Sequence, residues 1–537
     1  MLRAPFYIFL MLASLSVAAQ ETHPTKSIEP YYDISLTDAE RDSLQTNIEG
    51  FQKEYKALHG YKMDNSVPMS LVFDPLPTGF LIPVGKGDAD YWIINDKVQL
   101  PANKEDLAFY PVYKLAVLIK NKEITSTELT SLYISRIKKY SDTLQCVITL
   151  LEERAMRDAK KADEEIGAGR YKGPLHGIPY GVKDLLAVEG TKTTWGATPF
   201  KDQTIEETAQ VVKNLKAAGA VLICKFTMGA LAMGDIWYGG VTKNPWNLKQ
   251  GSSGSSAGSA SGTSAGLVAF AIGTETLGSI VSPATRCGVA GLRPTYGAVS
   301  TKGAMTLSWS MDKIGPICRS ARDCGLVYHA MIGEEAKYLR SKSDPRKLKV
   351  AYLKTAFDSN YPTKANDDEA LKIIRSMGIE PVAVELPQGL PVSAIRIMLT
   401  AEAGAAFDEL TRANIDDQLT DQRKGAWPNT FRASRFIPAV EYINASRARK
   451  QLIEEYHAKL GEYDIIISPT FASGQLLTTN LTGHPCLVVP NGFNDQGSPT
   501  SISFLGKLYG EIELVGFARA YQEASEWDEK IPPLFKP

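Results

Sequence analysis

The sequence lacks the patterns by which metal, nucleotide and nucleic-acid sites are usually recognised. Its six histidines and six cysteines are dispersed, without an HExxH motif or paired metal-type cysteine spacing, so a metal site has little support. Neither GxGxxG nor a closing Gly-Lys-Ser/Thr occurs in its one Gly/Ser-rich tract, so both nucleotide fingerprints fail. The 59 Lys and Arg residues balance 60 Asp and Glu, which leaves no basic surplus for neutralising phosphates and argues against a nucleic-acid partner.

Long apolar runs are missing everywhere except near the N-terminus. Arg3 precedes an apolar run over residues 6–19 that ends in small residues. A positive start, a short hydrophobic middle and a small-residue end are typical of a secretory signal peptide, and the run is too short for a comfortable membrane span. We predict cleavage after Ala19 and a periplasmic or secreted protein, the alternative being an uncleaved anchor. No cysteine near that position supports a lipid anchor, and disulfide pairing is left open.

What the sequence does contain describes an ordinary globular protein. The 537 residues are 44% hydrophobic and 22% charged, which excludes disordered and disulfide-scaffold chains. Two capping boxes, at 37–40 and 125–128, predict helices. Strand-like apolar runs near Val147, in AVLICKF and in DIIISPT alternate with helical patterns, so we predict an α/β fold with a central mixed β-sheet covered by helices on both faces.

Residues 251–266 read GSSGSSAGSASGTSAG. A flexible linker is the simplest interpretation of this composition. Glycines at 254, 258, 262 and 266 are spaced by four, however, which would place them on one face of a helix that another backbone can approach closely. The tract also runs directly into the apolar segment LVAFAIG, so we expect a buried, closely packed element.

Two further segments could supply acyl-transfer chemistry to serines of this tract. The glycine-containing turn in GTETLGSIVSPA, residues 273–284, could direct backbone N–H groups at an oxyanion. Lys183 follows an apolar run punctuated by Gly and Pro, where burial could lower its pKa enough for it to accept a proton. Taken singly, an isolated lysine is usually solvated and a serine in a turn usually caps the backbone.

The combination of these segments resembles the amidase signature family. The similarity runs from about residue 107 to 335 and continues more loosely to about residue 520. The motifs that carry it are the following: Lys183, NPWNL at 244–248, SGSSAGS at 253–259, GTETLGSIVSPATRCGVAGLRPTYGAVS from residue 273, and SMDKIGP at 310–316. It implies a catalytic domain over residues 106–530, after a signal peptide at 1–19 and an accessory helical or irregular segment at 20–105.

The resemblance also implies the chemistry, a Ser-cisSer-Lys triad without metal or cofactor. Ser279 would be the nucleophile, Ser255 the bridging serine after a cis peptide bond from Gly254, and Lys183 the final base. The oxyanion hole would consist of backbone N–H groups, those of Thr276, Leu277, Gly278 and Ser279.

Three positions differ from the commoner family turn GTDxGGSIR. Glu275 replaces Asp, and could keep an acidic partner for the lysine and the backbone. Leu277 replaces a glycine, which keeps the same N–H donor but narrows the backbone freedom of the turn. Val281 replaces an arginine and so removes a cation that could orient an acidic substrate, which favours neutral or apolar amides.

The expected function is therefore an exported amidase that hydrolyses the C–N bond of a small carboxylic amide through a serine acyl-enzyme. An ester hydrolase stays open, as do an inactive binding protein and a glutamine amidotransferase-type subunit, although the signal peptide and the neutral charge argue against the last. We expect no nucleic-acid partner and no membrane span after cleavage, and leave a homodimer open. Residues 395–445, with WPNTFRASRF, and the N-terminal segment are expected to set specificity.

Overall fold

The computed structural model describes residues 23, 25–32, 34–60, 64–67, 71–82, 94, 96–333 and 344–537. The predicted signal peptide lies outside these ranges. The chain divides into two compact units, Met1–Asp64 and Asn65–Pro537. The described residues 65–67 and 71–82 fall in the second of these units, and the predicted domain boundaries stay predictions.

The smaller unit is built on helix α1 (Asp38–Gly60). Thr37 and Glu40 form the capping contacts that its sequence predicts, with the Glu40 backbone N–H donating to Thr37 Oγ1 at 3.3 Å and the Thr37 N–H donating to the Glu40 carboxylate. A buried ion pair between Arg41 Nε and Glu29 Oε1, at 2.6 Å, ties the start of the helix to the preceding turn.

The larger unit is organised around one mixed sheet of eleven strands within the described residues. Parallel pairs join β2 to β3 and to β8, and join β11 to β12 and β13, while the other neighbours are antiparallel. In sheet order the strands are β1 (Val147–Leu150), β3 (Val221–Phe226), β2 (Pro179–Lys183), β8 (Phe270–Glu275), β10 (Lys313–Cys318), β9 (Ala290–Arg293), β14 (Cys486–Phe493), β15 (Pro499–Gly506), β13 (Ile465–Pro469), β11 (Val350–Leu353) and β12 (Val382–Val384).

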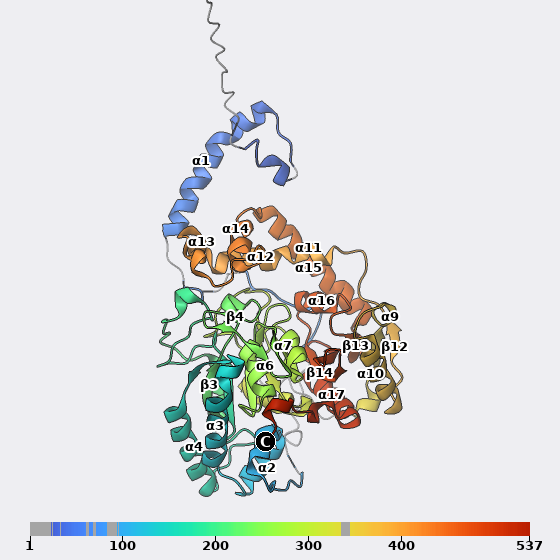
Figure 1. Cartoon of the computed structure of the whole chain (residues 1–537). Helices are drawn as coiled ribbons and strands as arrows, with labels where there is room; N and C mark the ends of the chain where they lie inside the picture. Colours follow the sequence, from blue (N-terminus) through green and yellow to red (C-terminus); the bar gives the residue numbers. More distant parts are fainter. Residues whose placement is uncertain are drawn as a thin grey trace, which may run out of the picture. The chain divides into compact units, whose positions relative to one another are not determined.

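Helices cover the sheet, and the helices α11 to α15 pack on one another (Figure 1). The fold class expected from the sequence is confirmed. The helices are α2 (Val112–Lys120), α3 (Ser126–Leu144), α4 (Glu152–Gly167), α5 (Gln210–Ala217), α6 (Ala257–Ser264), α7 (Val281–Cys287), α8 (Ala321–Ile332), α9 (Lys354–Asp358), α10 (Lys364–Ser376), α11 (Val392–Ile395), α12 (Ile397–Ala406), α13 (Asp408–Arg412), α14 (Trp427–Ser434), α15 (Ala439–Leu460), α16 (Gln475–Thr482) and α17 (Glu511–Ser525).

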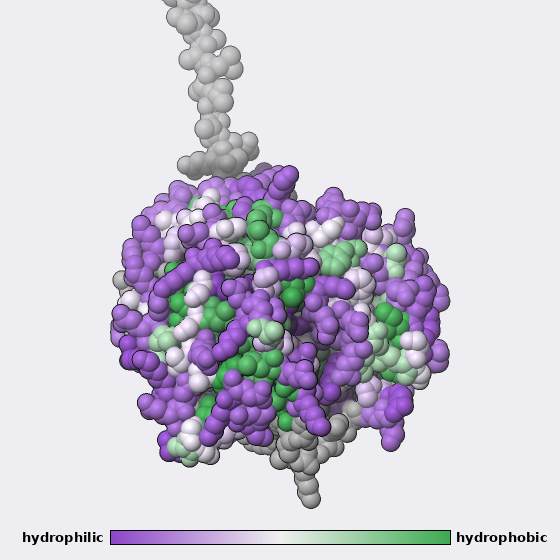
Figure 2. All heavy atoms as spheres, turned by 60° about the horizontal axis from the view of Figure 1, so that its bottom comes forward, coloured by the Kyte–Doolittle hydropathy of each residue, from purple (hydrophilic) through white to green (hydrophobic). Residues whose placement is uncertain are grey.

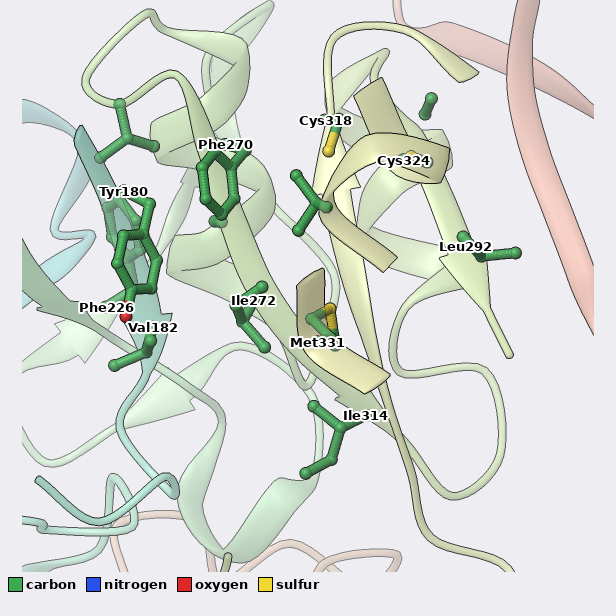
Figure 3. Close-up of a cluster of buried hydrophobic side chains, with 14 of the residues drawn as sticks. Tyr180, Val182, Phe226, Phe270, Ile272, Leu292, Ile314, Cys318, Cys324 and Met331 are labelled. Carbon is green, nitrogen blue, oxygen red and sulfur yellow. The ribbon is translucent and has the colours of Figure 1, made fainter. Parts of the chain in front are cut away.

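The core lies on the central strands, whose side chains are buried on both faces. On β2 and β8 the rings of Tyr180 and Phe270 stack with centroids 5.0 Å apart and planes 7° from parallel (Figure 3). Val182 and Ile272 follow on the same two strands and are also fully buried. Because these strands are rigidly packed, the residues at their ends are held in fixed positions.

Apolar side chains and thiols lie mainly inside the protein. Hydrophilic residues predominate on the face in Figure 2, with apolar residues in separated groups. All six cysteines lie within the described residues as buried free thiols. Within these ranges no helix has the length and apolar character needed to cross a bilayer.

The Gly/Ser tract is buried and is not a linker. Helix α6 covers only residues 257–264 of it, so the four regularly spaced glycines do not share one helix as expected. Close packing is nevertheless present, because a Cβ at Gly258 would collide with the backbone carbonyl of Cys146, and one at Gly262 with the ring of Phe226.

Candidate active site

Parallel pairing of β2 with β8 brings the predicted base and nucleophile to one edge of the sheet. Lys183 is the last residue of β2, and the turn leading to Ser279 follows the last residue of β8. The register pairs Tyr180 with Phe270 and Val182 with Ile272. Since the carboxyl ends of parallel neighbours meet at the same edge, residues almost a hundred positions apart become adjacent.

Lys183 is completely buried and is surrounded by hydroxyl groups. Its Nζ lies 2.8 Å from Ser255 Oγ, 2.9 Å from Thr274 Oγ1 and 3.2 Å from Ser256 Oγ. Burial lowers the pKa of Lys183 to about 7, against the opposing effect of the charges on Asp312 and Glu275. A lysine in this state can be neutral near pH 7, as a general base must be.

Ser255 lies at the start of the buried tract, after a cis peptide bond from Gly254. The Gly229 N–H donates to the Ser255 carbonyl at 3.3 Å. A Cβ at Gly254 would collide with the carbonyl of Gly234, so only glycine fits before the bridging serine. The loop after β3 therefore holds Ser255 through its carbonyl and packs against Gly254.

Ser256 connects this loop to the nucleophile turn. Its backbone N–H donates to the Ser279 carbonyl at 3.2 Å, and its Oγ accepts from the Thr274 N–H at 3.0 Å. The structure thus brings Lys183 into direct contact with Ser255, and links the loop of Ser255 to Ser279 through the backbone. The catalytic roles of these residues stay predictions.

The turn before Ser279 needs glycine at one position only. Gly278 has φ +88°, in the region that disfavours side chains. Leu277 does not have a positive φ, so its replacement of a glycine introduces no backbone strain. Its side chain packs instead at the edge of an apolar cluster that includes Met311 and Leu481.

Glu275 holds the other end of this turn. Its Oε2 accepts from the backbone N–H groups of Ile280 and Val281 at 2.8 and 3.0 Å. Its Oε1 accepts from Arg293 and Asn480, each at 2.9 Å. Burial alone would raise the pKa of Glu275, but these partners together lower it to about 2. Glu275 is therefore an anion that organises the turn rather than a hydrogen-bond partner of Lys183.

Asp312 supports the first residue of the turn from a neighbouring loop. Its Oδ1 accepts from Thr276 Oγ1 at 2.6 Å, and its Oδ2 accepts from the N–H groups of Leu307 and Ser308. Burial raises the pKa of Asp312, and these three donors oppose the rise.

The site also contains four residues that we did not predict from the sequence: Asp312, Arg293, Asn480 and Thr274. Three of them stand inside segments that carried the family resemblance: Thr274 in GTETLGS, Arg293 in GLRPT and Asp312 in SMDKIGP. Only their position within those motifs could have indicated a role in the site. The hydrogen bonds that bring the four residues into the site join positions distant in the sequence, so no local pattern predicts these contacts.

Asp184, the residue after Lys183, forms a buried ion pair with Lys225 of β3. Asp184 Oδ1 is 2.9 Å from Lys225 Nζ, and both side chains are fully buried. Asp184 also accepts from the N–H and hydroxyl groups of Thr194. The pair joins β2 to β3 at the point where Lys183 leaves the strand, so it stabilises the backbone that carries the base.

The segment WPNTFRASRF, expected to offer groups to a substrate, is largely engaged with the protein itself. Trp427 Nε1 donates to the Leu231 carbonyl at 2.8 Å, and the Trp427 ring stacks on Phe431. Arg432 pairs with Asp416 at 2.9 Å. These groups hold α14 in place.

Within the described part of the chain, no three His, Cys, Asp or Glu side chains gather as a metal ion would require. The groups that do gather are a lysine with a lowered pKa, two serines, and a turn fixed by buried carboxylates. This set can activate a hydroxyl nucleophile and stabilise an oxyanion.

The chain is similar to known proteins over most of its length. The Amidase family model matches residues 128–477, more than half of the chain. The A subunit of the glutamyl-tRNA(Gln) amidotransferase from Marinomonas sp. (strain MWYL1) is 32% identical over an alignment of 479 positions, and the match covers 79% of this chain and 98% of that protein. This name matches the glutamine amidotransferase-type subunit, an alternative to the exported amidase expected from the sequence.

Two of the solved structures with a similar fold are named as amidases. Native peptide amidase from Stenotrophomonas maltophilia superposes with a TM-score of 0.70 at 27% identity, covering 81% of this chain and all of that one. An amidase family protein from Bacillus anthracis str. Ames has a TM-score of 0.69 at 28% identity, covering 80% and 93%. The chain therefore belongs to the amidase family.

Proposed function

We propose that this protein hydrolyses the C–N bond of a carboxylic amide through an acyl-enzyme on Ser279. The observation that carries the proposal is the 2.8 Å contact between Lys183 Nζ and Ser255 Oγ, made by a buried lysine whose pKa is about 7. Neutral Lys183 takes the hydroxyl proton of Ser255, and Ser255 takes that of Ser279 as Ser279 attacks the amide carbonyl.

Backbone N–H groups of residues 276–279 hold the oxyanion in this proposal, and removal of one such donor in comparable sites costs about 3 to 4 kcal/mol of transition-state stabilisation. The proton then returns through Ser255 to the amine as the C–N bond breaks. Water hydrolyses the acyl-enzyme by the same route, and this releases the acid and restores Ser279.

The substrate side of the proposal is a small neutral or apolar amide. Val281, where the family often has arginine, is buried at the start of α7, and its N–H is used by Glu275. It offers no cation to an acidic substrate. We further propose that the protein is exported and begins at Gln20, which N-terminal sequencing of the mature protein tests; a chain that starts at Met1 would refute this part.

The names of the curated relatives favour a second candidate, a glutamine-hydrolysing subunit of an amidotransferase. Both candidates share the amide-cleaving step and differ in the substrate. Ser279-dependent release of ammonia from L-glutamine, with no hydrolysis of apolar amides, would support the second candidate.

A substrate panel with matched variants tests the proposal. Purified protein is assayed on L-glutamine, peptide amides, aryl amides and fatty amides, and on an ester matched to one amide. Ser279→Ala should abolish hydrolysis and labelling by a fluorophosphonate, and Ser255→Ala should lower the rate by orders of magnitude. Ser261→Ala is the control, since this buried serine of the same tract bonds the Lys243 carbonyl instead. Full activity in Ser279→Ala would refute the proposal.

A further inference from the structure

A segment that precedes the family-defining region, residues 71–82, lies along helix α15. We call it the strap. The Thr78 N–H and hydroxyl both donate to Glu454 Oε1, at 2.9 and 2.7 Å. Lys450 Nζ donates to the Leu76 carbonyl at 3.0 Å, and the Phe80 ring meets His457 edge-on. The family model begins only at residue 128, so the strap lies outside the region that this model matches.

One strap residue, Phe73, is held between two side chains from outside the strap. The guanidinium of Arg449 lies 3.4 Å from the centroid of its ring. The ring of Tyr296 meets it edge-on at 5.0 Å. Arg449 is itself fixed, because it donates to the carbonyl of Ser310 and to that of Leu481. Phe73 is therefore a preorganised aromatic wall and not a freely moving side chain.

That wall borders a cavity of about 320 Å³. A cavity of about 150 Å³ is enough for a benzene ring, so this one has room for an aryl or branched alkyl group with a short linker. Its apolar side includes Leu71, Val72 and Phe73 of the strap together with Tyr296 and Met305.

The cavity is also lined by neighbours of the predicted catalytic residues, although Lys183, Ser255 and Ser279 do not line it themselves. Thr274, which lines it, is hydrogen-bonded to Lys183, and Thr276, which also lines it, is the first residue of the oxyanion turn. Leu185 follows Lys183 by two positions, and Ala232 belongs to the loop whose Gly229 N–H holds Ser255. The cavity therefore adjoins Thr274, a direct hydrogen-bond partner of Lys183.

We propose that this cavity binds the amine part of the amide substrate and that Phe73 of the strap determines which amines fit. The inference rests on the proposed function. In that mechanism the leaving amine receives its proton from Ser255, and we place its substituent against the wall that Thr274, Leu185 and Ala232 form.

The lining also selects the class of amine. Leu71, Val72 and Phe73 of the strap, together with Tyr296 and Met305, form an apolar and partly aromatic part of the wall. The one carboxylate in the lining, Asp312, already accepts three hydrogen bonds, which leaves little capacity to bind a cationic substituent. The preferred substrate is an amide whose nitrogen carries an uncharged aryl or branched alkyl group, which a primary amide does not have.

The test varies the amine while the acyl group is kept constant. Amides of one small acid with ammonia, methylamine and an aryl amine are assayed for kcat/KM, and the free aryl amine is tested as a product inhibitor. In Phe73→Ala the ratio of kcat/KM for the aryl amide to that for the primary amide should fall about tenfold, and inhibition by the aryl amine should weaken by a similar factor.

Leu81→Ala is the matched control. It removes an apolar side chain from the same strap that is 86% exposed and does not line this cavity, so the ratio should not change. A Phe73→Ala ratio equal to that of the wild type would overturn the inference. In a second series with one amine and varied acyl groups, a Phe73→Ala effect that follows the acyl chain would overturn the inference as well.

The outcomes separate this inference from the proposed function. If the wild type hydrolyses amides in a Ser279-dependent manner but Phe73→Ala leaves the amine preference intact, only the inference fails. If no amide is hydrolysed and no fluorophosphonate label appears on Ser279, the proposed function fails. Unchanged circular dichroism and labelling of Phe73→Ala exclude misfolding as the cause of a lost preference.

Discussion

The protonation of Lys183 predicts a specific pH dependence of hydrolysis. A lysine with its ordinary pKa of about 10.4 is neutral in only about one molecule in 2,500 at pH 7. Burial lowers the pKa of Lys183 to about 7, so about half of the molecules carry the neutral base at that pH. We therefore expect kcat/KM to rise tenfold per pH unit below 7 and to level off above about 8, which is roughly a hundredfold increase between pH 5 and pH 8.

The assay must separate Lys183 from a second buried lysine. Lys313 Nζ donates to the Met311 carbonyl, and burial together with Arg293 also lowers its pKa to about 7. We predict that Lys313→Met keeps the rising limb near pH 7. Thr274→Val should move the limb to lower pH, because the Thr274 hydroxyl accepts from Lys183 and so favours the charged amine.

The measurement is kcat/KM for a chromogenic anilide at constant ionic strength, because this parameter reports the ionisation of the free enzyme. Circular dichroism at each pH excludes unfolding as the cause of the acid loss. A flat profile between pH 6 and 9 contradicts the assignment of Lys183 as the base. The assignment is also contradicted if the rise of kcat/KM with pH disappears in Lys313→Met, or if it stays at the same pH in Thr274→Val.

Three other predictions concern Glu275, Asp312 and the six cysteines. Glu275 has a folded pKa of about 2 against an ordinary value of 4.5, so its ionisation contributes about 3 kcal/mol of stability that is complete above pH 4.5 and is lost as the pH falls toward 2. Glu275→Gln should destabilise the protein by about 3 to 5 kcal/mol at pH 6, because it leaves Arg293 buried without its carboxylate; urea unfolding at pH 6 and pH 3 should show a smaller acid loss in the variant. Asp312→Asn should lower kcat roughly tenfold and change KM less, since Thr276 loses a charged acceptor near the oxyanion, and an unaltered kcat would remove Asp312 from this role. Ellman's reagent should titrate no thiol in the native protein and all six after denaturation, whereas fewer than six under non-reducing conditions would reveal a disulfide.

Much of the local structure follows directly from the sequence. The capping box at Thr125 and Glu128 begins helix α3 as predicted. The apolar run VLICKF forms a fully buried strand, and DIIISPT contains strand β13. Each of these signals is local, because it depends on residues within about six positions of one another. The sheet order is not local, and no sequence pattern placed β10 between β8 and β9.

The same limit explains which site residues could be predicted. Lys183, Ser255 and Ser279 stand in motifs whose resemblance to a family assigned them roles. Asp312 lies 36 positions from Thr276, and the two meet only because β10 follows Asp312 and pairs with the strand that precedes Thr276. The spacing of glycines by four correctly predicted close packing, yet α6 ends at Ser264, because spacing alone does not indicate where a helix begins or stops.

The placement of the carboxylates explains why the buried lysine can serve as a base. An acidic group in direct contact with Lys183 would favour the charged amine and raise its pKa. The carboxylates of Glu275 and Asp312 are close enough to act in that direction, but Glu275 is bound by Arg293, Asn480 and two backbone N–H groups, and Asp312 is bound by Thr276 and two more. Lys183 is left with neutral hydroxyl partners. The carboxylates thus fix the nucleophile turn without holding the proton on the base, so rigidity of the turn and basicity of the lysine are compatible in one buried site.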